Sequence, residues 1–385
     1  MRILIIGSDA NAYALAKYMS ELKKVDLVFV APGNKYICDF ATSVDIPASD
    51  VDELVDFAKA YEITLTVVVS EVAVNNSIST LFAKNGLHIF APTLDAARVS
   101  ISKSSAKKTL YKLRVQTPKF GIFDRENVAV DYARKSKYPL VVKTDTHSDS
   151  EKPVFCSSFK KAKRAIELFF ESFNKKIIVE DYVDAKLVSF YVLTDGFSAF
   201  PIGRVCKRTF DNDSLISYSP DYYISDEVES KIMSKVVYPI IDEIAKHSSP
   251  YVGVLGIDLL LRRDNFSVLE FNPFYTGVDL QCMLPLLEND FAELCLAATY
   301  GSLSDEYTYL SFSDKVSISM KIATYIKDVD FGDCKVTYDF DGSTIVTSLA
   351  STLTKAVERL INVMDYIEDY EYDKTSLLSI LESRL

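Results

Sequence analysis

The feature that most constrains the fold is a regular alternation of short apolar runs and helical segments near the N-terminus. The predicted strands are four apolar runs, at residues 2–6, 25–32, 63–70 and 87–92. The segments between them have the spacing of amphipathic helices, at residues 11–22, 51–60 and 77–86. Strands that alternate with helices at this spacing form βαβ units, whose strands run parallel. The sequence therefore predicts a doubly wound α/β domain at residues 1–93, built on an open parallel sheet.

After Thr117 the pattern changes to shorter strands, many of them joined in hairpins. Hairpins interleaved with helices are typical of α+β regions with largely antiparallel sheets. The main helices are predicted at residues 94–114, 126–137, 159–173, 226–248 and 283–301. We expect a central region at residues 94–300, with a subdomain at about 117–185 and a main part at about 186–300. A small C-terminal α+β domain is predicted at residues 301–385.

Composition excludes several classes of protein. A formal net charge of −11 argues against a nucleic-acid-binding face, which would need a basic patch. No stretch reaches about 18 uninterrupted apolar residues, so no membrane span is expected. The six cysteines are scattered and form no CxxC pair, which argues against a zinc site or a disulfide framework. We expect a cytoplasmic protein, monomeric or homodimeric, whose partners are small molecules.

A predicted hairpin, GVLGIDLLLRRDNFSVLEFNPF at residues 253–274, carries a possible metal site. Asp258 lies on its first strand, and Glu270 and Asn272 lie two residues apart on the second. Residues at that spacing point to one face of a strand. Two acids and an amide supply the oxygen ligands that Mg²⁺ prefers. The alternative is a half-buried hairpin with its charges on the wet face. A carboxylate within the apolar run VLEFN would be costly if unpaired, which favours the metal.

Other polar segments have both a functional and a simpler interpretation. Lys103 at the start of a helix and Lys143 at the end of a strand could each hold a phosphate, although single lysines are more often surface residues. The strand exit within IIVEDYVDA (177–185) could bind an adenine edge through backbone groups, or could be an exposed edge strand. The basic pair Lys207 and Arg208 is most simply part of a solvated turn.

Taken in order, these segments resemble the ATP-grasp ligases, and within them the glycinamide ribonucleotide synthetases (phosphoribosylamine–glycine ligases). The resemblance covers nearly the whole chain and depends on order and spacing more than on any single motif. The N-terminal segments that carry it are VFVAPGN (28–34), VVVSEV (67–72), LHIFAPT (87–93) and SKSSAKKTL (102–110). The later ones are VVKTD (141–145), VEDYVDA (179–185), SFYVLTDG (189–196), CKR (206–208), YSP (218–220), GVLGIDLLL (253–261), VLEFN (268–272) and LPLLENDFAELCLAA (284–298).

The resemblance implies a nucleotide site between two α+β subdomains. ATP phosphates would be held by Lys103 and Lys143. The adenine would be held by the segment Glu180, Asp181, Tyr182 and Val183. Mg²⁺ would be bound by Glu270 and Asn272, with Asp258 nearby.

The resemblance also implies the reaction. A carboxylate attacks the γ-phosphoryl group of ATP to give an acyl phosphate, and an amine then displaces phosphate. Positioning and electrostatic neutralisation of the phosphoryl group do most of this work. In the family the acid is glycine and the amine is phosphoribosylamine, a step of de novo purine biosynthesis. The implied catalytic residues are Lys207, Arg208 and Asp279. The implied substrate-binding residues are Gly7, Asn11 and Glu71.

The sequence departs from the family pattern at several substrate and phosphate contacts. The loop TDTHSDSEKP (144–153), which is glycine-rich in the family, has no glycine and three acids. Carboxylates near a phosphate repel it. Asn11 and Phe274 stand where arginines are expected, and Leu187 stands in place of a ribose-binding glutamate. Two alternatives therefore remain beside the family reaction: a diverged ligase with other substrates, and a catalytically inactive nucleotide-binding paralogue.

Overall fold

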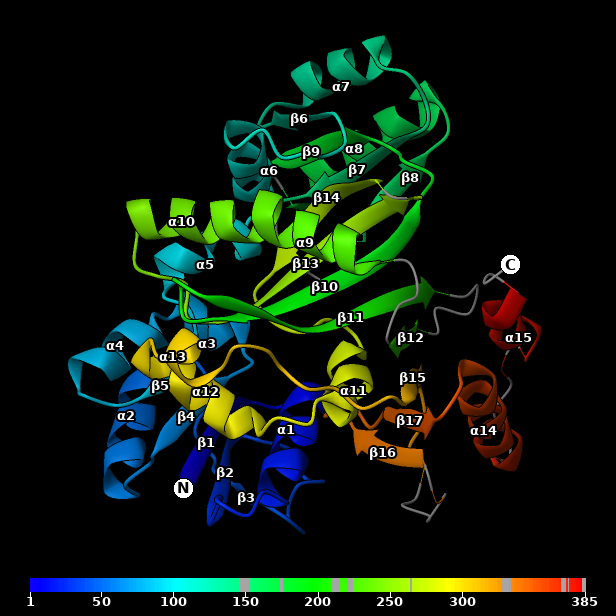
Figure 1. Cartoon of the computed structure of the whole chain (residues 1–385). Coiled ribbons are helices and arrows are strands. Elements are labelled where there is room, and N and C mark those ends of the chain that lie inside the picture. The colour runs from blue at the N-terminus through cyan, green and yellow to red at the C-terminus, as the bar shows by residue number, and fades with distance from the viewer. Residues whose placement is uncertain are drawn as a thin grey trace.

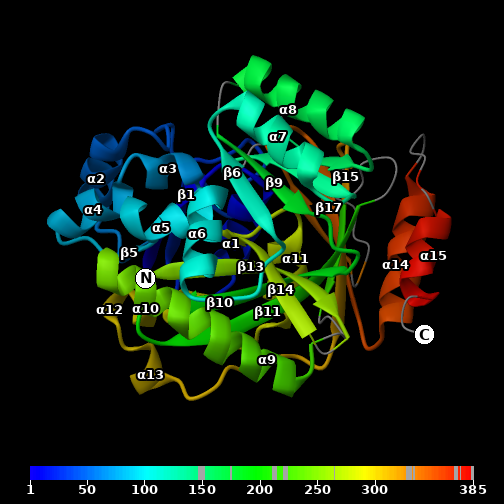
Figure 2. The ribbon, with the colours of Figure 1, turned by 90° about the horizontal axis from the view of Figure 1, so that it is seen from above.

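Three β-sheets organise the part of the chain that the structure describes (Figures 1 and 2). The computed structural model describes residues 1–145, 152–173, 176–209, 215–219, 224–263, 265–326, 332, 334–367, 372 and 374–382. Within these ranges, none of the helices combines the length and the apolar composition that crossing a bilayer requires. All six cysteines are free thiols, and Cys38 alone among them is exposed.

The N-terminal sheet is parallel and five-stranded, which confirms the predicted α/β domain. Its strand order is β3 (Thr42–Ser43), β2 (Leu27–Pro32), β1 (Arg2–Gly7), β4 (Leu65–Val68) and β5 (Ile89–Phe90). Helix α1 (Ala10–Ser20) packs with Ile3 and Ile5 on one face of the sheet. Helices α2 (Val51–Ala60) and α4 (Ile78–Lys84) pack with Leu4 and Ile6 on the other face. Strand β1 is buried on both faces, as its unbroken apolar run predicts.

A four-stranded antiparallel sheet forms the next unit, which lies at the top of Figure 1. Its order is β6 (Phe120–Phe123), β9 (Ile177–Asp181), β7 (Leu140–Thr144) and β8 (Val154–Cys156). Helices α7 (Glu126–Lys135) and α8 (Phe159–Phe173) pack with this sheet around one apolar core. This sheet confirms the antiparallel strand pairing that was expected in the region.

The third sheet is antiparallel and runs through both the central region and the C-terminal part of the chain. Its order is β14 (Asn265–Asn272), β13 (Gly253–Arg262), β10 (Lys186–Thr194), β11 (Ala199–Thr209), β12 (Leu215–Ser219), β15 (Val316–Ile322), β17 (Thr344–Ala350) and β16 (Cys334–Tyr338). The helical run α9 (Asp226–Ile232), a π-helical segment and α10 (Tyr238–His247) pack on one face, together with α14 (Leu353–Tyr366). A second short C-terminal helix, α15 (Lys374–Glu382), lies beside α14 (Figure 2).

Two of the predicted helices were wrong in extent. The helix expected at 94–114 is two helices, α5 (Leu94–Ile101) and α6 (Lys103–Lys112), because Ser102 takes an extended conformation and caps α6. Its hydroxyl accepts a hydrogen bond from the backbone N–H of Ser105, as N-cap residues do. The helix expected at 283–301 begins only at Phe291, in α12 (Phe291–Tyr300), where the Asp290 carboxylate caps it.

The sequence prediction also missed several short elements. The residues before α12 form a separate helix, α11 (Asp279–Met283), and a 3₁₀ turn. Strand β12 and the short helices α3 (Glu71–Asn75) and α13 (Leu303–Glu306) were not predicted either. Elements of four or five residues contain too few positions for a periodic signal.

Candidate active site

Five charged side chains form a continuous chain of ion pairs where α6, β7, β9 and β14 meet. Glu180 lies between two lysines, with its Oε1 2.7 Å from Lys143 Nζ and its Oε2 2.7 Å from Lys107 Nζ. Glu270 Oε2 lies 3.5 Å from Lys143 Nζ and 3.9 Å from Lys103 Nζ. The order of charges is thus Lys107, Glu180, Lys143, Glu270, Lys103, which alternates in sign and sums to +1.

The backbone fixes this arrangement. Lys103 and Lys107 are one helical turn apart, so both project from the same face of α6. Strands β7 and β9 are antiparallel neighbours, and Val141 pairs with Glu180 two residues before Lys143. Side chains two residues apart on a strand lie on one face. The charged side chains of α6, β7 and β9 therefore meet at positions set by regular secondary structure, and none of them comes from a loop.

Helix α6 is tied to the end of β7 by Asp145. The Asp145 carboxylate accepts hydrogen bonds from the backbone N–H of Ser104 at 2.6 Å and from its hydroxyl at 2.9 Å. It also accepts one from the Ser102 hydroxyl, and its own carbonyl accepts the Lys103 N–H at 2.9 Å. A carboxylate at a helix N-terminus is favoured by the helix dipole. Lys103 is consequently held next to the strand that carries Lys143.

Burial sets the electrostatics of the lysines. Lys107, Lys143 and Glu180 are each no more than 2% exposed. Burial lowers the pKa of the Lys107 ammonium, and Glu180 only partly offsets that effect. Burial also acts to lower the pKa of Lys143, but Glu180 and Glu270 outweigh it and the net shift is upward. Lys143 is therefore a firmly charged ammonium held in place from both sides.

The predicted adenine segment leaves β9 next to this chain. The Glu180 side chain contacts the lysines, so only its backbone and the three residues after it remain available to a base. The Asp181 N–H donates to Lys119 O and the Tyr182 N–H to Pro139 O, which fixes the strand exit. Val183 is half-buried and the Tyr182 ring is 43% exposed, with its edge against Phe155.

The predicted metal residues lie together on β13 and β14, as the hairpin pattern indicated. Asp258 pairs with Glu270 across the two strands, and Gly256 pairs with Asn272. The Asn272 amide nitrogen donates to Asp258 Oδ2 at 3.1 Å, which leaves the amide oxygen of Asn272 as its possible ligand atom. Asp258 Oδ1 accepts the Ser189 hydroxyl proton and lies 3.5 Å from Lys207 Nζ.

This donor set fits Mg²⁺ only together with a substrate. Among the described residues no group of three or more histidine, cysteine or acidic side chains could hold a metal by itself. Mg²⁺ is commonly held by one or two carboxylate or amide oxygens plus phosphate oxygens and water. Glu270 and Asn272 match that requirement, whereas both oxygens of Asp258 already have protein partners.

The predicted catalytic residues Lys207 and Asp279 belong to a second buried cluster. Lys207 Nζ lies 2.9 Å from Asp279 Oδ2 and donates to Thr276 Oγ1 at 2.5 Å. Asp279 also accepts hydrogen bonds from the Tyr191 hydroxyl at 2.5 Å and the Ser217 hydroxyl at 2.7 Å. Burial acts to lower the pKa of Lys207, but Asp258 and Asp279 raise it well above its usual value. Asp279 is fully buried, so we infer that its carboxylate holds Lys207 in position.

Two other predictions fall partly or wholly outside the described residues. Arg208 lies on β11 opposite Ile216, but its side chain is not among those described. The acidic loop at 144–153 is described only at its ends, because residues 146–151 lie outside the described ranges.

The predicted substrate residues gather at the start of α1 and α3. A Cβ at Gly7 would lie 2.7 Å from Val69 Cγ2, so this position requires glycine. Asn11 donates to Asp9 Oδ2 at 3.0 Å, and the Asp9 carboxylate also accepts the Ala12 N–H, so it caps α1. Glu71 begins α3, and burial raises its pKa while the Lys103 charge opposes that shift. The electrostatic influence of Lys103 on Glu71 links the substrate residues to the lysine chain.

Sequence reasoning missed several residues of these clusters: Lys107, Tyr191, Thr276 and Asp9. Lys107 had a usable signal, since it follows Lys103 by one turn and directly follows Ala106 in the buried stripe of α6. Tyr191 had none, because it stands within an apolar strand where an aromatic residue is ordinary. Asp9 is preceded by Gly7 and Ser8 and followed by a helix, which is an N-cap pattern.

An N-terminal parallel sheet, two antiparallel units and a buried lysine pair facing a carboxylate–amide hairpin together define an ATP-grasp protein. The sequence matches the N domain of phosphoribosylglycinamide synthetase over residues 1–100 and the ATP-grasp (A) domain of the same enzyme over residues 101–279. The chain therefore belongs to the phosphoribosylglycinamide synthetase family.

Individual relatives agree with the family match. The chain is 33% identical to a phosphoribosylamine–glycine ligase of Lactococcus lactis over 311 residues, which cover 78% of this chain and 76% of the relative. It is 30% identical to the corresponding ligase of Haemophilus influenzae over 349 residues, 86% and 81% of the two chains.

Solved structures agree with the fold. The crystal structure of phosphoribosylamine–glycine ligase from Thermotoga maritima superposes with a TM-score of 0.76 at 15% identity and covers 94% of this chain and 96% of that one. The biotin carboxylase domain of a Hydrogenobacter thermophilus 2-oxoglutarate carboxylase, solved with MgADP and bicarbonate, gives a TM-score of 0.74 at 16% identity. That match covers 97% of this chain and 90% of the other.

Proposed function

We propose that this protein is an ATP-dependent carboxylate–amine ligase that joins glycine to phosphoribosylamine in de novo purine biosynthesis. The observation that carries the proposal is the lysine–carboxylate chain of the ATP-grasp site, found in a chain whose relatives are named phosphoribosylamine–glycine ligases. The family match extends over both the N domain and the ATP-grasp domain, so it includes the substrate loop as well as the nucleotide site.

In this proposal each residue of the lysine chain has a separate task. Lys143 and Lys103 hold the ATP phosphates, and Glu180 keeps Lys143 extended towards them. The backbone from Asp181 to Val183 receives the adenine. Lysine ammonium groups act on phosphate as point charges, and the attraction between them is strongest in a buried site of low dielectric.

Glu270 and Asn272 would hold Mg²⁺, which neutralises negative charge on the transferring phosphoryl group when bound. Glu270 contacts Lys103 and Lys143 in this structure. Ligation of the cation therefore requires Glu270 to exchange lysine contacts for metal contacts. The same exchange frees Lys103 and Lys143 to contact the phosphates. We therefore expect Mg²⁺ and ATP each to increase the affinity of the protein for the other.

The bond-forming steps follow from the charges nearby. Attack of the glycine carboxylate on the γ-phosphoryl group of ATP breaks the bond to the β–γ bridging oxygen, so an acyl phosphate forms and ADP leaves. The amine then attacks the acyl carbon, inorganic phosphate leaves, and the amine nitrogen loses a proton. Lys207, fixed by Asp279, Asp258 and Thr276, is the cation of the second cluster. Its constant charge suits stabilisation of the acyl phosphate oxygens. In this proposal the amine is bound by Gly7, Asn11 and Glu71.

A diverged ligase with another amine is a second candidate, favoured by one observation. The Asp9 carboxylate occupies the N-terminus of α1, within the predicted substrate loop. Helix N-termini are ready binding places for phosphate groups, and a carboxylate there disfavours a phosphorylated substrate.

The test is ADP formation from MgATP with glycine and phosphoribosylamine added singly and together. The proposal predicts ADP formation that requires both, and a loss of Mg²⁺-dependent turnover on the order of 100-fold in Glu270→Ala. ADP formation with glycine and a different amine, but not with phosphoribosylamine, would support the diverged ligase. Turnover that Glu270→Ala leaves unchanged would overturn the metal assignment.

A further inference from the structure

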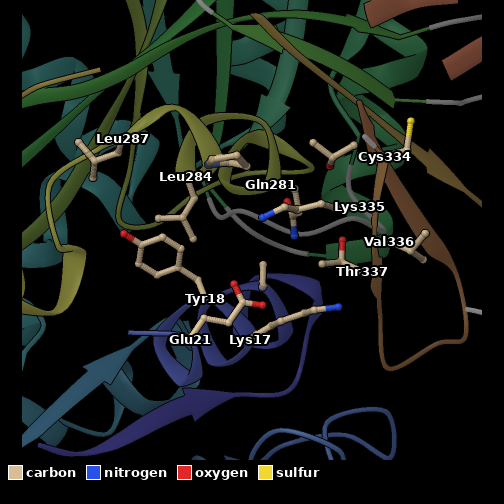
Figure 3. A pocket seen from close by; sticks show the side chains of 13 residues that line it. Lys17, Tyr18, Glu21, Gln281, Leu284, Leu287, Cys334, Lys335, Val336 and Thr337 are labelled. Atoms are coloured by element: carbon tan, nitrogen blue, oxygen red, sulfur yellow. The ribbon is translucent and has the colours of Figure 1, made fainter. Parts of the chain in front are cut away.

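A cavity of about 590 Å³ lies between three parts of the chain that are distant in sequence (Figure 3). One wall is the outer face of α1, the second is the segment from α11 through the following turn, and the third is β16 with β17. Its volume is in the range of small-molecule sites. The cavity does not include any member of the lysine chain or of the Lys207 cluster.

The lining of the cavity combines charged, polar and apolar side chains. Lys17 and Glu21 project from α1, and Lys335 reaches from β16 across the cavity towards Gln281 and Leu284 (Figure 3). The apolar lining consists of Ala14, Leu284, Pro285, Leu287 and Val336, with the ring of Tyr18 beside them. Two lysines and one glutamate give the cavity a charge of +1, within a chain whose net charge is −11.

The lysines of the cavity are not neutralised. Lys17 is half-buried and Lys335 is exposed, and within the described ranges neither of them has a carboxylate at ion-pair distance. The two lysines that the structure buries most deeply among the described residues, Lys107 and Lys143, each have a carboxylate within 3 Å. Two lysines that line one cavity without a paired carboxylate favour an anionic ligand.

Gln281 adds a hydrogen-bonding requirement. It is 4% exposed and lines the cavity, and its Nε2 donates to Ala10 O at 2.9 Å. Its Oε1 is enclosed and accepts no hydrogen bond from the described residues. A buried carbonyl oxygen without a donor is costly, so a ligand hydroxyl that reaches Gln281 would be favoured.

We propose that this cavity binds a phosphomonoester carried on a hydroxyl-bearing organic body, such as a nucleoside monophosphate or a sugar phosphate. The phosphate lies between Lys17 and Lys335, a hydroxyl donates to Gln281 Oε1, and the apolar side receives the rest of the body. Gln281 links the cavity to the reaction, because it bonds to Ala10 next to Asn11 and lies two residues after Asp279. The site is therefore regulatory: its ligand acts on the substrate loop and the Lys207 cluster without contacting either reactant.

The test is calorimetric titration of the full chain with adenosine 5′-monophosphate, ribose 5-phosphate and inorganic phosphate as probes. The ATP site is first filled with a non-hydrolysable MgATP analogue, so that binding there is not counted. The expected result is saturable binding of at least one of the two organic phosphates, tighter than that of inorganic phosphate. Charge reversal in Lys17→Glu and in Lys335→Glu weakens it by about tenfold or more, which corresponds to about 1.4 kcal/mol.

A matched control is Lys160→Glu, an exposed lysine of α8 on a different unit, which should bind the probe as the wild type does. No saturable binding by either organic phosphate would overturn the proposal, as would equal affinity for inorganic phosphate or unchanged affinity in both charge-reversal variants. Binding of the MgATP analogue is recorded in the same variants. Failure of the MgATP analogue to bind would count against the proposed function and not against the proposed ligand site in this cavity.

Discussion

At the scale of single residues, the site is built from charges that each have a partner of opposite sign, and all of the lysine chain except the half-buried Glu270 is buried. Removing one member of a buried ion pair lowers the stability of the fold more than replacing both members by apolar residues does, because it leaves the other charge uncompensated. Glu180 contacts two lysines through different oxygens, so it depends on both. Within the described residues Lys107 forms its ion pair with Glu180 and none with the residues predicted to bind metal or substrate, so we infer that it keeps Glu180, and hence Lys143, in place.

Replacing Lys107 by methionine should therefore destabilise the fold. The change keeps most of the side-chain volume but removes the partner of Glu180 Oε2. We expect a loss of on the order of 3 kcal/mol in the free energy of unfolding, measured by urea titration. Lys108→Met is the matched control, because Lys108 is its exposed neighbour on α6 and should change the stability little. Equal effects of the two changes would refute the buried-pair account.

Asp9 gives a prediction about pH. Burial, with the Asp339 charge added to it, raises the pKa of the Asp9 carboxyl despite the hydrogen bonds from Ala12 and Asn11. The folded state therefore binds this proton more tightly than the unfolded state does. The favourable contribution of protonated Asp9 is complete below its unfolded pKa, at about pH 4, and disappears as the pH rises through the folded pKa.

Asp9→Asn should accordingly raise the melting temperature at pH 7, since asparagine keeps the helix cap and removes the charge. The advantage should shrink as the pH falls towards about 4, where the wild-type carboxyl is itself protonated. Asp50→Asn, at the exposed N-cap of α2, is the control and should show little gain. A gain for Asp9→Asn that is the same at both pH values would contradict the assignment.

At the scale of elements, the junction between α6 and β7 sets the positions of Lys103 and Lys143, which are proposed to hold the ATP phosphates. Asp145→Ala removes the acceptor of the Ser104 N–H and of two serine hydroxyls. We expect a loss of about 1–2 kcal/mol in stability, typical of a lost helix cap. We also expect a higher KM for ATP, because Lys103 directly follows the capping residue Ser102.

The control for this change is Asp131→Ala, at an exposed position of helix α7, where the carboxylate contacts only the exposed Arg134 among the described residues. It should alter neither quantity. An Asp145→Ala variant with normal stability and normal KM would show that the junction does not position Lys103.

The elements that could be predicted from sequence are those with a long periodic signal. The parallel N-terminal strands and the β13–β14 hairpin were predicted because their apolar runs are uninterrupted or end at a clear turn. The break at Ser102 was missed because a serine within a helical pattern is ordinary, and only the cap geometry shows that the chain turns there. Strand β12 was missed because an element of five residues is too short to give a periodic signal.

The candidate site was predictable to a similar degree. Lys143 and Glu270 were expected near one another from the resemblance, and the structure brings them to 3.5 Å. That Glu180 would contact lysines through its side chain was not predictable, because strand alternation gives the face of a residue but not its partner on another element. The fully buried position of Asp279 likewise depends on how α11 packs against the third sheet.

At the scale of the whole molecule, the third sheet connects the proposed nucleotide site with the C-terminal part. Strand β12 is hydrogen-bonded to β15, so the strands after residue 315 continue the sheet that carries Asp258 and Lys207. The domain division predicted at residues 300 and 301 therefore falls between elements that share one sheet. The cavity proposed to be regulatory lies where this C-terminal part meets α1 (Figure 3).

The most direct test of the central claim is the melting temperature of the protein with and without MgATP, in the wild type and in Lys143→Met. A ligand at roughly 100 times its Kd stabilises the native state by about 2.7 kcal/mol, so the wild type should melt several degrees higher with MgATP. The shift should grow with ATP concentration, need Mg²⁺, persist in the control Lys108→Met and be lost in Lys143→Met. No shift in the wild type at millimolar MgATP, or an equal shift in Lys143→Met, would contradict the account that the lysine chain forms the ATP site.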